Sequence, residues 1–107
     1  MVSETAETYH TVARVGEIEE GRGAPFEVEG RPIAVFLDEG VYYATDDVCP
    51  HQGLPLCDGF VADKTVTCTW HGWCFRLTDG RWVDNPRILV GTYPVRVVGD
   101  EIQVRIV

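Results

Sequence analysis

The stretches CPHQGLPLC (residues 49–57) and VTCTWHGWC (residues 66–74) each contain a cysteine and a histidine in close spacing. The first holds a Cys-x-His pair and the second a Cys-x-x-His pair, with sixteen residues between the two pairs. The candidate metal ligands are Cys49, His51, Cys68 and His71. Two thiolates and two imidazoles can hold either one tetrahedral zinc ion or the two irons of a [2Fe–2S] cluster. The choice between these metals decides the function.

The spacing of the first pair favours iron over zinc. One residue separates Cys49 from His51, whereas paired zinc ligands in fingers and ribbons are typically roughly two to four residues apart. Glycines also follow the pairs, at Gly53 and Gly72, and glycine lets the backbone approach closely and direct N–H groups at a bound anion. A cluster with bridging sulfides is such an anion. A structural zinc module that binds a protein partner is the alternative that the residues leave open.

The two stretches together resemble the Rieske [2Fe–2S] proteins, whose pattern is C-x-H, a gap of about sixteen or more residues, and C-x-x-H. The resemblance extends to CPHQG at residues 49–53 and WHGWxF at residues 70–75, and more loosely to TYPVRV at residues 92–97. It implies one [2Fe–2S] cluster, with two cysteines on a buried iron and two histidines on an outer iron. The cysteines would be Cys49 and Cys68, and the histidines His51 and His71.

Length and charge limit the organisation and the partners. The chain has 107 residues, 9 basic and 17 acidic, and a formal charge of −8. This length predicts a single domain, residues 1–107, with the cluster-binding part at about 46–87. We expect no nucleic acid as a partner, because the charge has the wrong sign for binding phosphates. Negative charge instead favours encounter with basic protein surfaces.

The start of the chain predicts a protein that is neither secreted nor anchored. Residues 1–7 are polar and acidic, unlike the basic and then apolar start of a secretory signal. No run approaches the roughly eighteen apolar residues that a membrane-spanning helix needs. The Rieske proteins of cytochrome bc complexes carry an N-terminal membrane anchor, so the chain differs from that branch. We expect a cytoplasmic monomer without membrane contact.

Two cysteines are left after the candidate ligands are assigned, Cys57 and Cys74. Cytochrome bc relatives have a disulfide between the cluster loops, at positions that correspond here to Leu54 and Trp70, and neither is a cysteine. In a cytoplasmic protein we expect the two remaining cysteines to be small buried thiols. A redox disulfide between them is the alternative.

Period-two alternation of β-forming residues, interrupted by turns rich in glycine, aspartate and proline, predicts an all-β fold. The expected strands are residues 9–15, 25–29, 31–37, 41–45, one within 58–67, 74–77, 81–83, 92–98 and 101–107. Turns are predicted at Glu29–Gly30 and at residues 38–40. Small antiparallel sheets would stack as a sandwich or partial barrel. By resemblance, residues 84–87 form a loop over the third side of the cluster.

A cluster whose four ligands all come from the protein leaves no open iron position for substrate, so the chain is expected to transfer electrons and not to be an enzyme. Catalytic Rieske oxygenases need a separate mononuclear iron held by two histidines and a carboxylate. High-potential relatives have serine and tyrosine hydroxyl donors where this chain has Trp73 and Phe75. Without those donors the cluster should lie near the negative end of the Rieske range. A small apolar rim of Leu54, Pro55, Leu56 and Trp73 would suit transient docking.

The resemblance is strongest to Rieske ferredoxins of multicomponent aromatic-ring dioxygenase systems. It implies a soluble carrier that passes single electrons from a flavin reductase to a terminal ring-hydroxylating oxygenase in aromatic hydrocarbon catabolism. The first alternative is a small Rieske subunit of an assimilatory nitrite reductase. The second alternative is the zinc module. The third histidine, His10, is predicted to be a surface residue without a chemical role.

Overall fold

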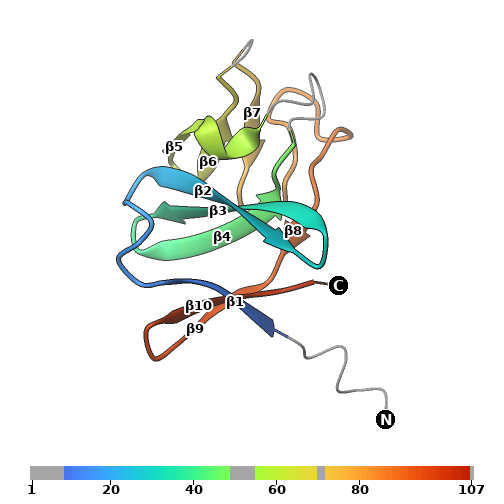
Figure 1. Cartoon of the computed structure of the whole chain (residues 1–107). Coiled ribbons are helices and arrows are strands. Elements are labelled where there is room, and N and C mark those ends of the chain that lie inside the picture. The colour runs from blue at the N-terminus through green and yellow to red at the C-terminus, as the bar shows by residue number, and fades with distance from the viewer. Residues whose placement is uncertain (1–8, 49–54, 70–71, 107) are drawn as a thin grey trace.

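The computed structural model of the chain describes residues 9–48, 55–69 and 72–106, and over these residues it is almost entirely β-structure (Figure 1). Its strands form three antiparallel sheets, which confirms the predicted all-β fold of small antiparallel sheets. The described part of the chain contains no helix that is long and apolar enough to cross a membrane.

The first two sheets form the body of the molecule, the lower part in Figure 1. The first sheet, in the order β1-β10-β9, consists of β1 (Tyr9–Arg14), β10 (Glu101–Arg105) and β9 (Val95–Val98). The second sheet, in the order β2-β3-β4-β8, consists of β2 (Arg22–Val28), β3 (Arg31–Asp38), β4 (Val41–Asp46) and β8 (Thr92–Tyr93).

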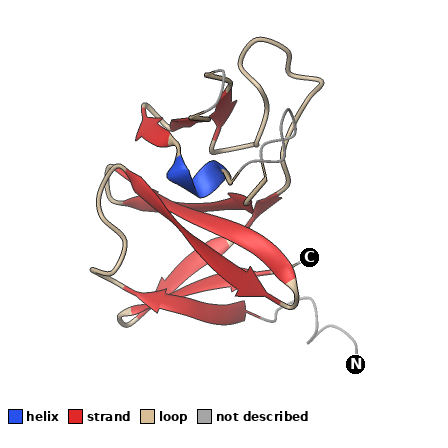
Figure 2. Cartoon of the chain, turned by 45° about the horizontal axis from the view of Figure 1, so that its top comes forward, coloured by secondary structure: helices blue, strands red, loops and turns tan. Residues whose placement is uncertain are grey.

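Above the body lies a smaller region that we call the arm, defined as residues 55–69 and 72–91 (Figure 2). It holds the 3₁₀ helix η1 (Leu56–Asp58) and the third sheet, with strands β5 (Phe60–Ala62), β6 (Thr65–Thr67) and β7 (Cys74–Arg76). The sequence predicts one strand within residues 58–67, but the structure has a hairpin there. Its turn residues Asp63 and Lys64 both have positive φ, at 54° and 62°. The prediction missed this turn because neither residue is glycine.

Strand β3 lies between two apolar cores, because the side chains on both of its faces are buried. Successive side chains of a strand point to opposite faces. Ile33 and Val35 lie in the apolar core between the two body sheets, whereas Ala34 and Phe36 lie in a second core beneath the arm. Phe36 is fully buried against Gly23 of β2, where an added Cβ would be 2.5 Å from the ring. Replacing a buried ring of this size by alanine costs roughly 3–5 kcal/mol of stability.

Two tight turns connect the strands of the second sheet. Glu29 and Gly30 have φ values of 52° and 79°, and Glu39 and Gly40 have φ values of 51° and 79°, the pattern of type I′ hairpin turns. The predicted turn at Glu29–Gly30 is confirmed. The second turn is shorter than the predicted 38–40, because Asp38 stays in β3 and accepts a hydrogen bond from the Lys64 amide at 2.7 Å.

The C-terminal segment differs from the prediction of one strand over residues 92–98. Pro94 divides it, so that β8 pairs with β4 in the second sheet and β9 pairs with β10 in the first. Proline has no amide hydrogen for a sheet ladder. Its carbonyl still accepts a hydrogen bond from the Arg105 amide at 3.0 Å. The expected strand at residues 81–83 is reduced to isolated bridges, Phe75 with Trp82 and Arg81 with Leu89.

Candidate metal centre

Three of the four predicted ligands, Cys49, His51 and His71, lie outside the described residues. The fourth, Cys68, directly follows β6 and has only 1% of its surface exposed. The described residues nevertheless fix both ends of each loop that carries a predicted ligand pair. The described part of the site consists of the bases of these two loops.

The first loop leaves the body at Asp47 and reaches η1 of the arm at Cys57. The Asp47 carboxylate accepts a hydrogen bond from the Cys57 amide at 2.8 Å, which closes the loop at its base. The Asp47 amide donates to the carbonyl of Pro32 at 3.0 Å, so the same residue also fastens the loop to the body. A single aspartate thus connects the two ends of the first loop to each other and to the body.

Asp46, the preceding residue, joins the same loop base to the end of the arm. Its carboxylate accepts hydrogen bonds from the Tyr93 hydroxyl and from the Gly91 amide, the latter at 3.1 Å. Its own amide donates to the Gly91 carbonyl at 2.9 Å. Burial, and then the bond to Asp46, raises the pKa of Tyr93, so the hydroxyl stays protonated and continues to donate. The segment after the arm is therefore fixed beside the entry to the first loop.

The second loop is closed by the backbone at Cys68 and Trp73. The Cys68 amide donates to the Trp73 carbonyl at 2.7 Å, which places the two residues opposite each other where β6 ends and β7 begins. Within this loop Gly72 has φ +71°, a conformation that glycine adopts without strain. The backbone on either side of the segment that contains the predicted ligand His71 is thus closed by the Cys68–Trp73 bond.

The bases of both loops meet in one core. Leu56 and Cys57 of η1 belong to the same buried group as Cys68, together with Phe75 of β7. Leu56 is fully buried, so it belongs to the core and not to the predicted docking rim. The fold thus brings the end of the first loop to the start of the second, as a centre shared by the two predicted pairs requires.

Aromatic side chains line the arm next to Cys68. The rings of Trp73 and Trp82 are stacked, with centroids 3.6 Å apart and planes 8° apart. The Trp73 ring also lies 6.3 Å from that of Phe75, in a tilted arrangement. The sequence pointed to Trp73 and Phe75, but it gave no signal for Trp82, which joins them only through the fold of residues 77–91.

The two remaining cysteines are free thiols and not a disulfide. Cys57 is buried, as predicted, and burial followed by the charge of Asp47 raises its pKa to about 12. It is therefore a neutral thiol at neutral pH. Cys74 is only half-buried, with its sulfur 3.1 Å from the Thr67 hydroxyl. It pairs with Thr67 on the outward face of the third sheet, the side opposite Cys68.

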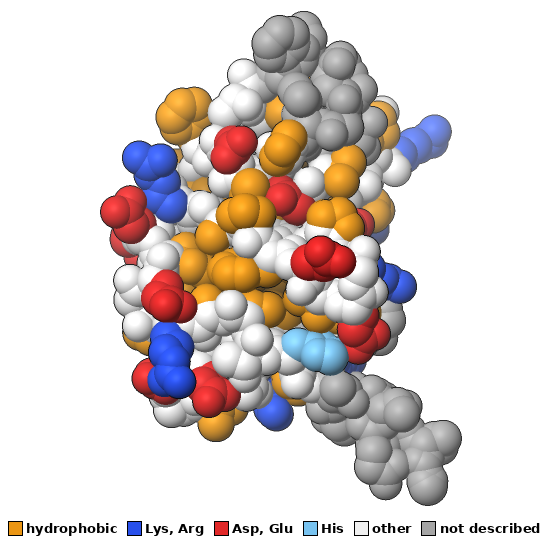
Figure 3. Space-filling model, viewed as in Figure 1, with side chains coloured by type: hydrophobic (Ala, Val, Ile, Leu, Met, Phe, Trp, Pro, Cys, Tyr) orange, Lys and Arg blue, Asp and Glu red, His pale blue; other side chains and the backbone are white. Residues whose placement is uncertain are grey.

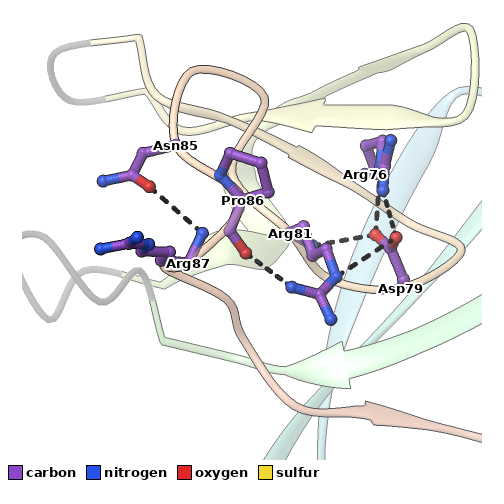
Figure 4. A network of polar contacts seen from close by, with 6 residues as sticks. All are labelled: Arg76, Asp79, Arg81, Asn85, Pro86 and Arg87. Atoms are coloured by element: carbon purple, nitrogen blue, oxygen red, sulfur yellow. Dashed lines mark hydrogen bonds and ion pairs between the residues drawn. The ribbon is translucent and has the colours of Figure 1, made fainter.

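A network of arginines orders the outer loop of the arm (Figure 4). Arg76 and Arg81 both contact the carboxylate of Asp79, and the bond from Arg76 is the main cause that lowers the pKa of this carboxyl. The Arg81 guanidinium also donates to the Pro86 carbonyl at 2.7 Å. These contacts hold the proline loop together, whereas its predicted position over the cluster stays a prediction.

His10 lies on β1, where its imidazole contacts the Glu29 carboxylate at 2.6 Å with 33% of the side chain exposed. It is part of the body and not of the arm. The prediction of a surface residue outside the metal site agrees with this position.

Comparison with known proteins identifies the family. The Rieske [2Fe–2S] domain family matches residues 8–94. A ferredoxin component of a naphthalene 1,2-dioxygenase system from Pseudomonas aeruginosa is 34% identical over 89 residues, which cover 82% of this chain and 86% of that protein. The chain spans only 25% and 16% of the length of two larger curated relatives that it also matches.

Solved structures show the same fold. A protein from Mycobacterium tuberculosis, assigned as an NADH-dependent nitrite reductase small subunit, has a TM-score of 0.88 and 31% identity, with 94% of this chain and 96% of that chain covered. The ferredoxin of carbazole 1,9a-dioxygenase from Nocardioides aromaticivorans IC177 has a TM-score of 0.83 and 29% identity, with 91% and 96% covered. The resemblance read from residues 49–75 is confirmed.

Proposed function

The chain belongs to the Rieske [2Fe–2S] domain family, and we propose that it is a low-potential ferredoxin that passes single electrons from a flavin reductase to a terminal ring-hydroxylating oxygenase. Its cofactor is one Rieske-type [2Fe–2S] cluster, so the zinc module is set aside. The bound cluster gains and loses one electron.

We propose that Cys49 and Cys68 ligate one iron and His51 and His71 the other. The donor set has the two thiolates and two imidazoles of a Rieske centre. Cys68 is buried, as a ligand of the inner iron should be. The other two cysteines fit less well, because Cys57 is a neutral thiol beside Asp47 and Cys74 is on the opposite face of its strand.

The likeness to whole ferredoxin components is the observation that carries the proposed function. The match covers 86% of the naphthalene dioxygenase ferredoxin and 96% of the carbazole dioxygenase ferredoxin. The two closed loop bases support it physically. The bonds of Asp47 to Cys57 and of Cys68 to Trp73 restrict movement of the loop bases, and a site that is organised before the reaction needs little rearrangement.

The nitrite reductase small subunit is the second candidate, and a specific observation favours it. The Mycobacterium tuberculosis protein assigned to that role is structurally similar over 94% of this chain, with a TM-score of 0.88. The two candidates differ in their partners: a free carrier binds reductase and oxygenase in turn, whereas a subunit stays bound to its enzyme. We propose the free carrier, in the cytoplasm and monomeric.

A reconstitution experiment distinguishes the two. The purified chain is mixed with NADH, a flavin reductase and the terminal oxygenase of a naphthalene or carbazole dioxygenase, and reduction of the oxygenase is followed by its absorption spectrum. The proposal predicts reduction that depends on the chain and increases with its concentration. Co-purification with a nitrite reductase catalytic subunit, without reduction of either oxygenase, would contradict it.

A further inference from the structure

The stacked pair of Trp73 and Trp82 is fixed by the backbone on both sides. Trp73 is tied to Cys68 by the amide–carbonyl bond of 2.7 Å. Trp82 donates its amide to the Ile88 carbonyl at 2.9 Å and forms a β-bridge with Phe75. The next amide, of Val83, donates to the Cys74 carbonyl at 2.9 Å. The stack therefore does not depend on a loose surface loop.

The pair lies on the same side of the third sheet as Cys68. Residues that oppose each other in an antiparallel pair point to the same face, so Trp73 faces the same way as Cys68. Both tryptophans also pack against the buried core that contains Cys68. With centroids 3.6 Å apart, the two rings leave no room for a water molecule between them.

We propose that the stacked indoles of Trp73 and Trp82 exclude water from the Cys68 side of the cluster and thereby hold its reduction potential low. The reduced cluster carries one more negative charge than the oxidised cluster, and a surrounding of low polarity stabilises that charge less than water does. Trp82 acts through Trp73 and is a positioning residue. The inference rests on the proposed function as a low-potential carrier.

Substitution of Trp82 tests the proposal on the isolated, cluster-loaded protein. Trp82→Ala opens the Cys68 side to water, and Trp82→Phe leaves a smaller ring in place. Phe60→Ala is the matched control, because Phe60 is an aromatic residue of the same arm that is 73% exposed on the outward face. Midpoint potentials are measured by voltammetry at one pH, and water near the reduced cluster is measured in D₂O as deuterium modulation of the electron spin echo.

We expect Trp82→Ala to shift the equilibrium toward the reduced state by roughly three- to tenfold, a rise of about 30 to 60 mV for one electron, and to deepen the deuterium modulation. The midpoint potential should rise less in Trp82→Phe, and it should not change in Phe60→Ala. An unchanged or lower potential in iron-replete Trp82→Ala would overturn the proposal, and so would an equal rise in Phe60→Ala.

If Trp82→Ala does not retain iron, Trp82→Phe decides: a rise supports the proposal and no rise overturns it. These measurements need no partner protein. Failure to reduce an oxygenase would therefore contradict the proposed function without affecting the comparison of potentials.

Discussion

In the body, β2, β3 and β4 contain 7, 8 and 6 residues and pair along almost their whole lengths, whereas each strand of the third sheet in the arm contains 3 residues. Three residues is the short end of the usual range of strand lengths, so this sheet has few ladder hydrogen bonds. The arm instead depends on contacts such as the Asp47–Cys57 bond, the arginine contacts of Asp79 and the tryptophan stack. The arm is thus stabilised by contacts of specific side chains and, as we propose, by the bound cluster. The body is stabilised by the pairing of its long strands.

The two regions also differ in charge. The arm contains four acidic and four basic residues, whereas the body, residues 9–48 and 92–106, contains eleven acidic and five basic residues. The face drawn in Figure 3 shows acidic side chains spread around the body and hydrophobic side chains between its two sheets. The negative charge of the described residues therefore comes mainly from the body.

The largest effect is expected from Cys68→Ala. Loss of this ligand should remove all iron and acid-labile sulfide, because a [2Fe–2S] cluster needs four ligands. The body should keep its slow amide hydrogen exchange while the amides of β5 to β7 exchange faster. Cys74→Ala is the control and should keep a full cluster. A cluster retained in Cys68→Ala, or an equal loss of protection in β3, would break the distinction between the two regions.

The second largest effect is expected from Phe75→Tyr, which should raise the midpoint potential of the cluster. Phe75 is fully buried and points to the same face as Cys68, so a hydroxyl there can donate toward the cluster, as in high-potential relatives. If the bond favours the reduced state by roughly 1 to 2 kcal/mol, the potential rises by about 40 to 90 mV.

Direct voltammetry of the wild type and the variant at one pH measures this rise. Phe60→Tyr is the control, since that ring faces solvent. An equal or lower potential in a Phe75→Tyr protein with full iron and an unchanged type of paramagnetic resonance signal would refute the hydrogen-bond explanation.

A smaller effect is expected in alkaline solution from Cys57, which joins the arm to the body. Its pKa is raised to about 12 from an ordinary value of 9.0. Above pH 9 the unfolded thiol loses its proton while the folded thiol keeps it, so stability falls as pH rises toward the folded pKa. The expected loss of unfolding free energy is about 1 kcal/mol between pH 9 and pH 10.

Denaturant unfolding of wild type and Cys57→Ala at both pH values measures this loss. The unfolding free energy of Cys57→Ala should fall by about 1 kcal/mol less than that of the wild type between pH 9 and pH 10. Equal falls in both proteins would show that Cys57 does not carry the alkaline instability.

The smallest effect is expected on the rate of encounter with the reductase. Electron transfer should slow by a few fold between low and high salt, because exposed charges beyond a Debye length of about 8 Å at physiological salt are screened. Stopped-flow reduction at several ionic strengths measures it. Glu19→Lys, a change on the exposed body, should lower the rate at low salt and weaken the salt dependence. A rate independent of ionic strength would remove the steering argument and leave the cluster assignment unaffected.

The sequence predicted most of the body and less of the arm, for a physical reason. Turns such as Glu29–Gly30 are encoded locally, because glycine at a positive φ marks them. The turn at Asp63–Lys64 has no such mark. The division of residues 92–98 between two sheets follows from Pro94, but which strands accept the two parts depends on contacts far along the chain.

The candidate site likewise has a part that the sequence predicts and a part that it does not. The spacing of the cysteines and histidines alone predicts the ligand pairs, since metal chemistry restricts which residues can serve, and this assignment stays a prediction. The residues that close the bases of the loops could not be predicted from the sequence. Asp47 precedes the first pair as an ordinary acidic residue, and only the fold brings its carboxylate to the Cys57 amide. Trp82 likewise becomes part of the site only because residues 77–91 fold back onto β7.

The central claim is that two histidines bind the cluster of this chain, and electron–nuclear double resonance of the reduced protein with ¹⁵N-labelled histidine tests it most directly. The chain has three histidines, and His10 lies on β1 in contact with Glu29. We predict two ¹⁵N couplings in the wild type that are unchanged in His10→Gln. The absence of histidine couplings, a single coupling, or the loss of one in His10→Gln would contradict the assignment of His51 and His71 as ligands.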